Sequence, residues 1–356
     1  MSADPAIWFP TVCTGTGTDV FTERLVSGLR RYGLRAEITW LPLRAEYAPW
    51  TIPVPQPPPW ATITHVNTWL HARFLPNNLP LVATIHHAVH HPDARTYKGT
   101  VRAIYHSRWI APNERRILRR AARVIAVSQF VADSARQTLL DVPMDVIYNG
   151  INTDTFCPPS TPRKSRRPFH LLYVGSWQAR KGVDLLPKIL GDLGDGFKLY
   201  YTGGPASESD KPCMPPNMHD LGRLKGDAAV VTAMQQADLL ILPSRSEGHP
   251  LVAIEAMACG LPIIGMRGSS VAEAVTHGTT GLLCSRDDVL AFATAVRNLS
   301  DNTKRYTEMA QAARENVTLR FSETIMLKAY IDLYQQLVPL TTSTGTRGSP
   351  KIDCKY

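Results

Sequence analysis

Two glutamates on either side of a turn are the residues whose types and spacing most directly suggest chemistry. Glu247 and Glu255 lie in SRSEGHPLVAIEAMACGLPIIG, residues 244–265, around a Gly-His-Pro turn. Carboxylates accept hydrogen bonds from hydroxyl groups, and a helix that starts between them offers unpaired backbone N–H groups to a phosphate. Such an arrangement would suit a sugar attached to a nucleotide. The spacing alone leaves a second interpretation open, in which both carboxylates are solvated at the surface.

The flanking sequence predicts the elements that position this pair. ADLLILPS (237–244) is a continuous apolar run typical of a buried parallel strand, and Pro250 favours the first turn of a helix. CGLP at 259–262 then predicts the end of the helix. The turn therefore lies at the carboxyl edge of a parallel sheet, where ligands of such folds bind.

Length and composition predict two globular domains. The chain has 356 residues, of which 44% are hydrophobic, and its formal net charge is +9. This charge favours an anionic partner, which could be a nucleotide, a nucleic acid or an acidic membrane surface. Short apolar runs alternate with segments of helical period, which predicts βαβ units and an α/β fold with doubly wound sheets. The runs lie at 81–85, 123–128, 170–175, 197–203, 237–244 and 261–266.

A change of composition indicates the domain boundary. Residues 149–169 are rich in Pro, Ser and Arg and read as a linker, so we expect a first domain at 1–153 and a second at 154–322. A last helix is expected over 323–340 with Ser322 as its cap, and 341–356 reads as a disordered tail. The apolar face expected for this helix consists of Ile325, Leu327, Ile331, Leu333, Tyr334 and Leu337.

The cysteines and the hydropathy pattern predict a cytoplasmic protein. Six cysteines are scattered without C-x-x-C spacing, and the first residues lack the pattern of a signal peptide. No run of 18 apolar residues is present, so the sequence predicts a chain that could lie on a membrane without spanning it.

Several motifs together resemble family 4 of the glycosyltransferases, enzymes of the GT-B fold. The segment 244–265 is similar, nearly position by position, to the family's E-x7-E element. SSVAEAVTHGTTGLLC (269–284) resembles its Gly-Gly-x-x-Glu segment, with Glu273 at the acidic position. VIYNGINTDTF (146–156) and LLYVGSWQARKGVDLL (171–186) are similar to the entry into the second domain and to its first strand and phosphate loop. The resemblance implies two Rossmann-like domains facing across a cleft, with the last helix crossing back to the first.

The resemblance also implies roles for individual residues. Glu255 would bind ribose hydroxyls and Glu247 the donor sugar, while Lys181 and Arg180 would stabilise the charge of the leaving diphosphate. Ser176 departs from the family pattern, which has arginine at that position. The segment LGRLKGDAAVVTAMQQADLLILPS (221–244) is similar to the family's base-contacting loop. The donor-binding residues implied are Gly15, Gly17, Gly175, Gly222, Arg223, Glu247, Gly248, His249, Pro250, Leu251, Val252 and Glu255.

In the first domain, residues 9–33 predict a strand, a glycine turn and a helix, with Thr18 or Asp19 as the cap. By resemblance Gly15 and Gly17 would approach the donor phosphates, although an ordinary turn between strand and helix would also use glycine here.

Histidines follow the run at 81–85. The resemblance implies that His86 contacts the donor sugar or the cationic transition state, by its side chain or its carbonyl; an ordinary loop histidine is the alternative. His87 stands where the family usually has aspartate, and His87, His90 and His91 are expected to shape the acceptor pocket. Their spacing could also hold zinc, but Pro92 interrupts and no other ligand is near, so no metal site is expected.

The resulting prediction is a retaining glycosyltransferase that needs no metal or other cofactor. Its donor would be a UDP- or GDP-linked sugar, and its acceptor a glycan, a lipid-linked molecule or a small molecule, in polysaccharide or glycoconjugate biosynthesis. The candidate catalytic residues are His86, Arg180, Lys181 and Glu247. Two alternatives are a UDP-sugar 2-epimerase of the same fold and a nucleotide-sugar-binding protein without catalysis.

NERRILRRAARVIAVS (113–128) predicts a basic helix that leads into a strand, and the arginines expected on the helix are Arg115, Arg116, Arg119, Arg120 and Arg123. It could lie against an anionic membrane or a lipid-linked diphosphate, or it could simply be solvated. Nucleic acid is not expected, since no binding motif accompanies these residues.

Overall fold

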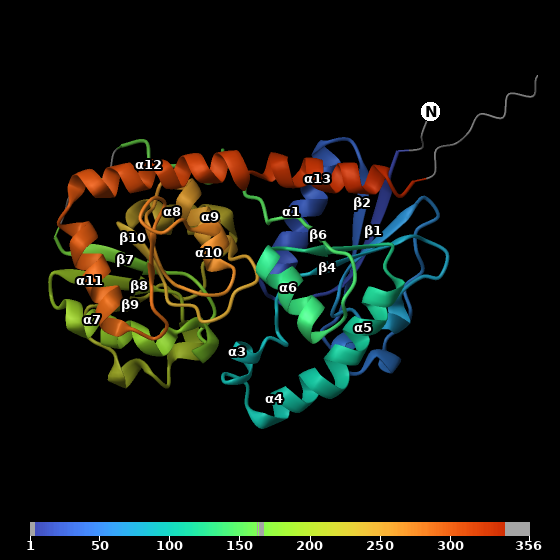
Figure 1. Ribbon diagram of the computed structural model, residues 1–356, viewed down its shortest axis with the longest axis horizontal. Helices are drawn as coiled ribbons and strands as arrows, with labels where there is room; N and C mark the ends of the chain where they lie inside the picture. Colours follow the sequence, from blue (N-terminus) through green and yellow to red (C-terminus); the bar gives the residue numbers. More distant parts are fainter. Residues whose placement is uncertain (1–3, 162, 164–166, 339–356) are drawn as a thin grey trace, which may run out of the picture.

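The computed structural model describes residues 4–161, 163 and 167–338 and contains two parallel β-sheets flanked by helices (Figure 1). The first sheet has the strand order β2-β1-β3-β4-β5-β6, and the second has the order β12-β11-β10-β7-β8-β9. These orders confirm the predicted α/β fold with two doubly wound domains. The tail expected at 341–356 lies outside the described residues.

The strands begin and end as follows: β1 Ala6–Val12, β2 Arg35–Leu41, β3 Ile63–Asn67, β4 Leu81–Ile85, β5 Arg123–Ala126, β6 Asp145–Val146, β7 Phe169–Tyr173, β8 Phe197–Tyr201, β9 Met218–Asp220, β10 Leu239–Leu242, β11 Ile263–Met266 and β12 Leu282–Cys284. The helices of the first domain are α1 Gly17–Arg31, α2 Arg44–Tyr47, α3 Pro92–Arg95, α4 Thr100–Tyr105, a π-helical stretch His106–Ile110, α5 Ala111–Arg120 and α6 Gln129–Thr138. The later helices are α7 Leu186–Leu193, α8 Gly226–Gln236, α9 Leu251–Ala258, α10 Val271–Ala274, α11 Val289–Ser300, α12 Thr303–Arg320 and α13 Glu323–Gln335. Short 3₁₀ turns cover Pro49–Thr51, Ala72–Phe74, Ala179–Lys181, Val183–Leu185, Gly204–Ser207 and Lys211–Cys213.

In both sheets the strand order reverses next to a glycine-containing loop. The order reverses between β1 and β3 in the first sheet and between β7 and β10 in the second. Ligands of such sheets bind outside the carboxyl ends of the strands at this point. In this chain those ends lead into the loops that hold Gly15 and Gly175.

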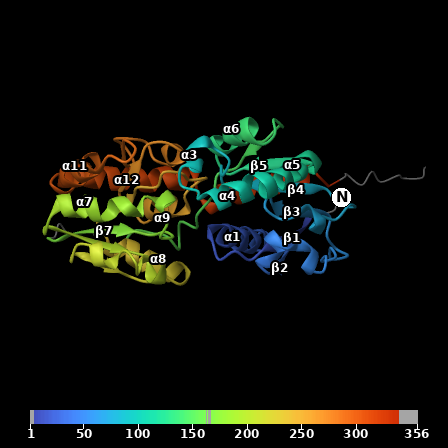
Figure 2. The same ribbon diagram turned by 90° about the horizontal axis from the view of Figure 1, so that it is seen from below.

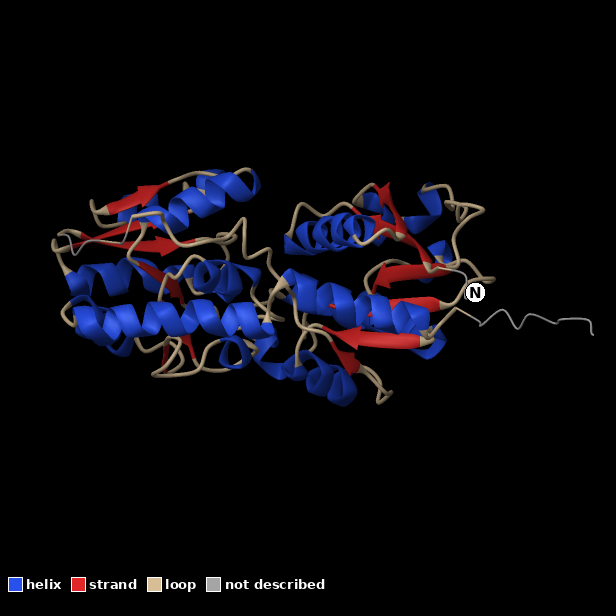
Figure 3. Ribbon diagram, turned by 90° about the horizontal axis from the view of Figure 1, so that it is seen from above, coloured by secondary structure: helices blue, strands red, loops and turns tan. Residues whose placement is uncertain are grey.

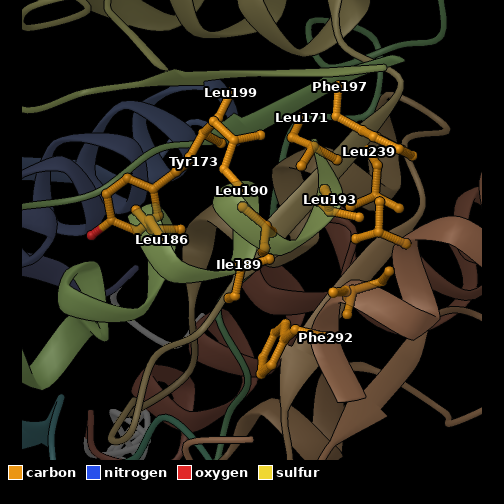
Figure 4. Packing of buried hydrophobic residues seen from close by; sticks show 14 of the residues in the cluster. Leu171, Tyr173, Leu186, Ile189, Leu190, Leu193, Phe197, Leu199, Leu239 and Phe292 are labelled. Carbon is orange, nitrogen blue, oxygen red and sulfur yellow. The ribbon is translucent and has the colours of Figure 1, made fainter. Parts of the chain in front are cut away.

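The core of the second domain has two layers. On one face of the sheet, Leu186, Ile189 and Leu190 of α7 pack against strand residues that include Tyr173, all of them buried (Figure 4). The other face is covered by α9, on which α12 packs. The apolar runs are therefore buried on both faces, as in parallel sheets generally.

The last two helices connect the domains. Figure 1 and Figure 3 show α12 over the second domain and α13 continuing over the first. Here α13 packs against α1 so closely that a Cβ built on Gly28 would be 2.6 Å from the Leu327 side chain. The crossing of the last helix to the first domain agrees with the expected GT-B arrangement.

The buried face of α13 differs in part from the expected one. Ile325 is 43% exposed, whereas Met326 and Tyr330 are buried. Tyr334, which was expected on this face, is also buried, and its Oη lies 2.6 Å from Nδ1 of His65. Ser322 is at the N-cap position, but its side chain makes no capping hydrogen bond.

Candidate functional site

The turn between β10 and α9 lies buried against the first domain. Residues 241–250 are all buried, and a Cβ built on Gly248 would be 1.8 Å from the carbonyl oxygen of His86. The Ser128 hydroxyl of the first domain also donates to the carbonyl of Gly248, at 2.6 Å. The loops after β4 and β5 therefore contact the turn that was predicted to bind the donor.

Lys181, in the loop after β7, forms an ion pair with Glu247 of this turn. The Lys181 Nζ is 2.7 Å and 2.9 Å from the two carboxylate oxygens of Glu247, and the Glu247 side chain is only 6% exposed. Burial alone would raise the pKa of Glu247, but Lys181 and Arg180 outweigh burial and lower this pKa to about 2. Burial lowers the pKa of Lys181, and Glu247 opposes that shift. Both side chains are therefore charged. A diphosphate could replace Glu247 as the partner of Lys181, and a sugar hydroxyl could replace Lys181 as the partner of Glu247.

Arg180, the residue before Lys181, contacts the same turn. Its Nη1 donates to the carbonyl of Ser246 at 2.6 Å and lies 3.1 Å from Nε2 of His87. Burial, reinforced by Arg180, lowers the pKa of His87 to about 3, so the imidazole is neutral. If Nε2 accepts from Arg180, the ring proton is on Nδ1, which is buried and has no hydrogen-bond partner within the described part of the chain.

The glycine loop of the first domain is shaped by an acidic residue. The Asp19 carboxylate accepts from the N–H of Thr14 at 2.8 Å and of Gly15 at 2.6 Å, and Gly15 has a φ of +69°. The cap of α1 is Thr16, whose side chain accepts from the N–H of Thr18 at 3.4 Å, so the expectation of Thr18 or Asp19 was wrong. Asp19 instead bends the preceding loop, since Asp side chains readily bond backbone N–H groups in turns.

Two helix N-termini face each other across the domain interface. A Cβ built on Gly17, the first residue of α1, would be 4.0 Å from the Leu251 side chain, at the first residue of α9. The first N–H groups of each helix have no preceding turn to bond, and both helix dipoles carry partial positive charge here. With Lys181 and Arg180 beside them, these ends make a site suited to a diphosphate.

Glu255 lies on α9 and is held by a residue of the first domain. Arg24 on α1 donates to Glu255 Oε1 at 2.9 Å and to Asp227 Oδ1 of α8 at 2.8 Å. Burial raises the pKa of Glu255, and Arg24 opposes that rise. Figure 1 and Figure 2 show α1 on the side of the first domain that faces α8 and α9.

His86 is oriented by Asn67 at the end of β3. Its Nε2 is 2.7 Å from Asn67 Oδ1, and its ring meets Phe21 edge-on with 4.7 Å between centroids. Because Asn67 donates from Nδ2 to Thr11, its Oδ1 accepts and the His86 proton is on Nε2. Burial lowers the pKa of His86 to about 3, so the ring is neutral.

Glu273 caps a helix of the opposite domain. Its two carboxylate oxygens accept from the N–H groups of Gln129 at 2.9 Å and Phe130 at 2.7 Å, at the start of α6. Tyr148 Oη donates to the same carboxylate at 2.9 Å. Glu273, the acidic residue of the segment that resembles Gly-Gly-x-x-Glu, therefore makes a contact between the domains.

The remaining predicted residues have the following contacts. The N–H of Gly222 donates to Asp220 at 2.7 Å, and Arg223 is exposed. The N–H of Gly175 donates to Thr202 Oγ1 at 2.9 Å. His249 is buried, and neither of its ring nitrogens has a hydrogen-bond partner among the residues the structure describes.

The structure thus brings most predicted residues to one interface. Lys181 pairs with Glu247, and Arg180 bonds the carbonyl of the preceding residue, Ser246. The carbonyl of His86 lies against Gly248 of the same turn. Glu255 is at the same interface but is bound by Arg24, which sequence reasoning missed. The sequence contained a signal for Arg24. It follows Gly17 by two helical turns, so it lies on the same face of α1 as the glycine predicted to approach the donor.

Metal ligands do not gather at this site. Within residues 4–161, 163 and 167–338, no three His, Cys, Asp or Glu side chains are grouped as a metal ion would require. The expectation of chemistry without a metal stays a prediction.

Family models match both domains. Residues 16–155 match the model of "Glycosyltransferase Family 4", and residues 168–302 match that of "Glycosyl transferases group 1". The chain is 26% identical over 241 residues to an uncharacterized glycosyltransferase of Methanocaldococcus jannaschii, 67% of this chain and 63% of that protein. It is 28% identical over 293 residues to a glycogen synthase of Mycobacterium tuberculosis, 76% of this chain and 68% of that protein. A D-inositol 3-phosphate glycosyltransferase of Catenulispora acidiphila is 31% identical over 221 residues, 55% of this chain and 51% of that protein.

Solved structures share the whole architecture. Sucrose-phosphate synthase from Thermosynechococcus elongatus superposes with a TM-score of 0.75 at 19% identity, covering 93% of this chain and 98% of that one. Anabaena HepE, solved with UDP-glucose, gives a TM-score of 0.70 at 15% identity, covering 93% and 100%. The fold is therefore GT-B. The two family models, which together cover most of the chain, show that it belongs to the family 4 glycosyltransferases.

Proposed function

We propose that this protein transfers a sugar from a nucleotide diphosphate donor to an acceptor hydroxyl, with retention at the anomeric carbon. The observation that carries this proposal is the buried Lys181–Glu247 pair beside the facing N-termini of α1 and α9. Support comes from the relatives, whose names are those of transferases and synthases, and from HepE, which was solved with UDP-glucose. UDP- and GDP-linked sugars are the donors to test first.

In this proposal the protein's cations act on the leaving group. The bond between the anomeric carbon and the diphosphate oxygen breaks, and its electron pair goes to the diphosphate. Lys181, Arg180 and the helix N-termini stabilise that charge. Glu247, released from Lys181 by the phosphates, accepts a hydrogen bond from a donor-sugar hydroxyl.

Retention would follow from attack on the same face that the diphosphate leaves. The acceptor oxygen bonds to the anomeric carbon, and its proton passes to an oxygen of the departing diphosphate. Neutral His86 offers the lone pair on Nδ1 to the oxocarbenium-like transition state, since Nε2 is bound to Asn67. In this route Glu247 accepts a hydrogen bond from a donor-sugar hydroxyl and does not attack the anomeric carbon, so no covalent sugar on the protein is expected.

The first experiment identifies the nucleotide by thermal shift with UDP, GDP and ADP. The donor sugar and acceptor then follow from release of the nucleoside diphosphate and from NMR of the product's anomeric proton. Lys181→Met should lower turnover at least tenfold, the scale of one charge-assisted contact. Lys188→Met, an exposed lysine of α7, serves as the matched control. A trapped sugar–protein adduct or an inverted product would contradict the proposed route.

The same experiments test the two alternatives. An epimerase would convert the donor without any acceptor, and the transferase names of the relatives do not favour it. A binding protein would show a nucleotide-dependent thermal shift without turnover across all acceptors tried.

We also propose contact with an anionic membrane through the start of α4 and the arginines of α5. A groove of about 490 Å³ on α5 is lined by Pro112, Arg115, Arg116, Arg119 and Arg120. Of the basic run, Arg115 binds the carbonyl of Leu139, so it has a structural role. Arg123 was expected on the helix, but it lies in β5 and pairs with Asp145.

The apolar part of this surface lies on the helix that precedes α5 in the chain. Val101 and Ile104 on α4 are 84% and 56% exposed, and α4 runs through the π-helical stretch into α5 (Figure 1). Apolar side chains beside cations are typical of helices that lie on a lipid surface. No helix of the described residues is long and apolar enough to cross a bilayer.

Sedimentation with vesicles tests this contact. Arg116→Glu/Arg119→Glu should abolish binding to vesicles that contain phosphatidylglycerol, whereas Lys304→Glu/Arg305→Glu on α12 should bind as the wild type does. Equal binding by all three proteins, or binding by none, would refute the proposed surface.

A further inference from the structure

Arg24 is a cation of the first domain whose partners, among the residues that the structure describes, belong to the second. Its guanidinium bridges Glu255 at 2.9 Å and Asp227 at 2.8 Å and lies over the Phe156 ring, 5.3 Å from the centroid. The Arg24 side chain is 15% exposed and that of Glu255 is 10% exposed. The fork of an arginine, unlike a lysine, can hold two carboxylates in fixed directions at once.

The contact uses only one of the two Glu255 oxygens. Nη1 of Arg24 bonds to Oε1, and no hydrogen bond to Oε2 is made by the described residues. A carboxylate has about four lone-pair positions, so Oε2 and the second lone pair of Oε1 stay available to a ligand. Arg24 therefore orients Glu255 without exhausting its capacity as an acceptor.

Resting on the function proposed above, we propose that Arg24 is a positioning residue for the nucleoside end of the donor. It holds Glu255 charged and directed so that its free oxygen accepts from the ribose hydroxyls. The ribose site would then be composite, with the acceptor on α9 and the residue that orients it on α1. Donor affinity would depend on the first domain being docked against the second.

The charges around Glu255 support this role. The groups that act on it are Arg24 from α1 and Asp227 from α8; burial and Asp227 favour the protonated acid, and Arg24 favours the anion. Without Arg24, a carboxyl buried next to Asp227 would hold its proton to higher pH and lose part of its acceptor capacity. The loss of affinity should therefore deepen as the pH falls.

Calorimetric titration of the full chain with UDP and with GDP tests the proposal. For the nucleotide that the wild type binds, Arg24→Met should weaken affinity about tenfold at neutral pH, and more at pH 5.5. Arg24→Lys should restore the pH profile but only part of the affinity. Arg31→Met is the matched control: Arg31 is on the same helix, and its partner Glu323 lies on α13, away from the ribose site.

A double-mutant cycle separates positioning from general stability. Glu255→Gln should weaken binding and remove the pH dependence, and Arg24→Met should then add no further loss. Unchanged or tighter binding in Arg24→Met would overturn the proposal, and tighter binding would show that Arg24 blocks the site. If the wild type binds neither nucleotide, the proposed function itself fails; if it binds and Arg31→Met weakens binding as much as Arg24→Met does, only the role of Arg24 fails.

Discussion

Gly248 lies directly against the carbonyl group of His86, although the two residues belong to different domains. A Cβ added to Gly248 would be 1.8 Å from the carbonyl oxygen and 3.3 Å from the Cα of His87. The contact is with backbone, which cannot move aside as a flexible side chain would.

Gly248→Ala should therefore force the domains apart and remove most activity. We expect kcat/KM to fall at least a hundredfold, because a displacement of about 1 Å at a reacting centre costs that much. Gly191→Ala is the control, since Gly191 is on α7 and a Cβ there would meet nothing within 4 Å. That variant should keep its activity and gain roughly 0.5–1 kcal/mol of stability. Normal kinetics in Gly248→Ala would show that the contact is not required for turnover.

Breaking the Lys181–Glu247 pair should destabilise the protein more than removing both partners. Lys181→Met leaves a carboxylate that is 6% exposed without its cation, a change that typically costs about 3–5 kcal/mol in unfolding free energy. The double variant Lys181→Met/Glu247→Gln should recover much of this loss in urea denaturation. Additive losses would show that the two side chains are stabilised by other partners.

The same pair predicts acid sensitivity. The pKa of Glu247 is lowered from an ordinary 4.5 to about 2, so its contribution is fully present above pH 4.5 and is lost as the pH falls towards 2. Wild-type unfolding free energy should therefore decline between pH 4.5 and 3 more steeply than that of Glu247→Gln. Parallel curves would contradict the assigned shift.

Glu273→Gln should loosen the contact between the domains. An amide has one acceptor oxygen, so it cannot serve the two N–H groups of α6 and the Tyr148 hydroxyl as the carboxylate does. The substitution also removes a negative charge from the N-terminus of α6, an interaction that typically stabilises a helix by about 0.3–1 kcal/mol. We expect a larger radius of gyration in X-ray scattering and lower kcat/KM. Glu308→Gln, on the exposed side of α12, should change neither quantity.

Ser269→Gly should stabilise the second domain. Ser269 has a φ of +50°, a left-handed conformation that costs an L-residue roughly 1–2 kcal/mol and glycine little. Its hydroxyl is buried and has no partner within the described part of the chain, so little is lost with it. The melting temperature should rise by a few degrees, and Ser285→Gly, where φ is not positive, should not raise it. A fall in the melting temperature would show that the Ser269 hydroxyl has a structural role.

Sequence reasoning reached those parts of the site that depend on local pattern. Strand β4 was expected at 81–85 and lies there, and the turn around Gly248 follows from an apolar run and a proline. Partners across the domain interface could not be predicted this way. Arg24 and Glu255 are 231 positions apart. Their contact depends on how the two domains pack against each other, which no short segment of the sequence determines. The exposure of Ile325 on α13 was missed for the same reason, since both Ile325 and Met326 fit an apolar helix face and only packing against α1 and β3 decides between them.

The return of α13 to the first domain also sets an order for biosynthesis. Residues of α13 complete the core that Ile7, Phe21 and Leu25 begin, so this half of the molecule cannot finish folding until almost the whole described chain has left the ribosome. The core of the second domain also includes late residues, among them Ala313 and Val317 of α12, but α12 precedes α13 in the chain. The second domain can therefore complete its core before the first, although most of it is translated later.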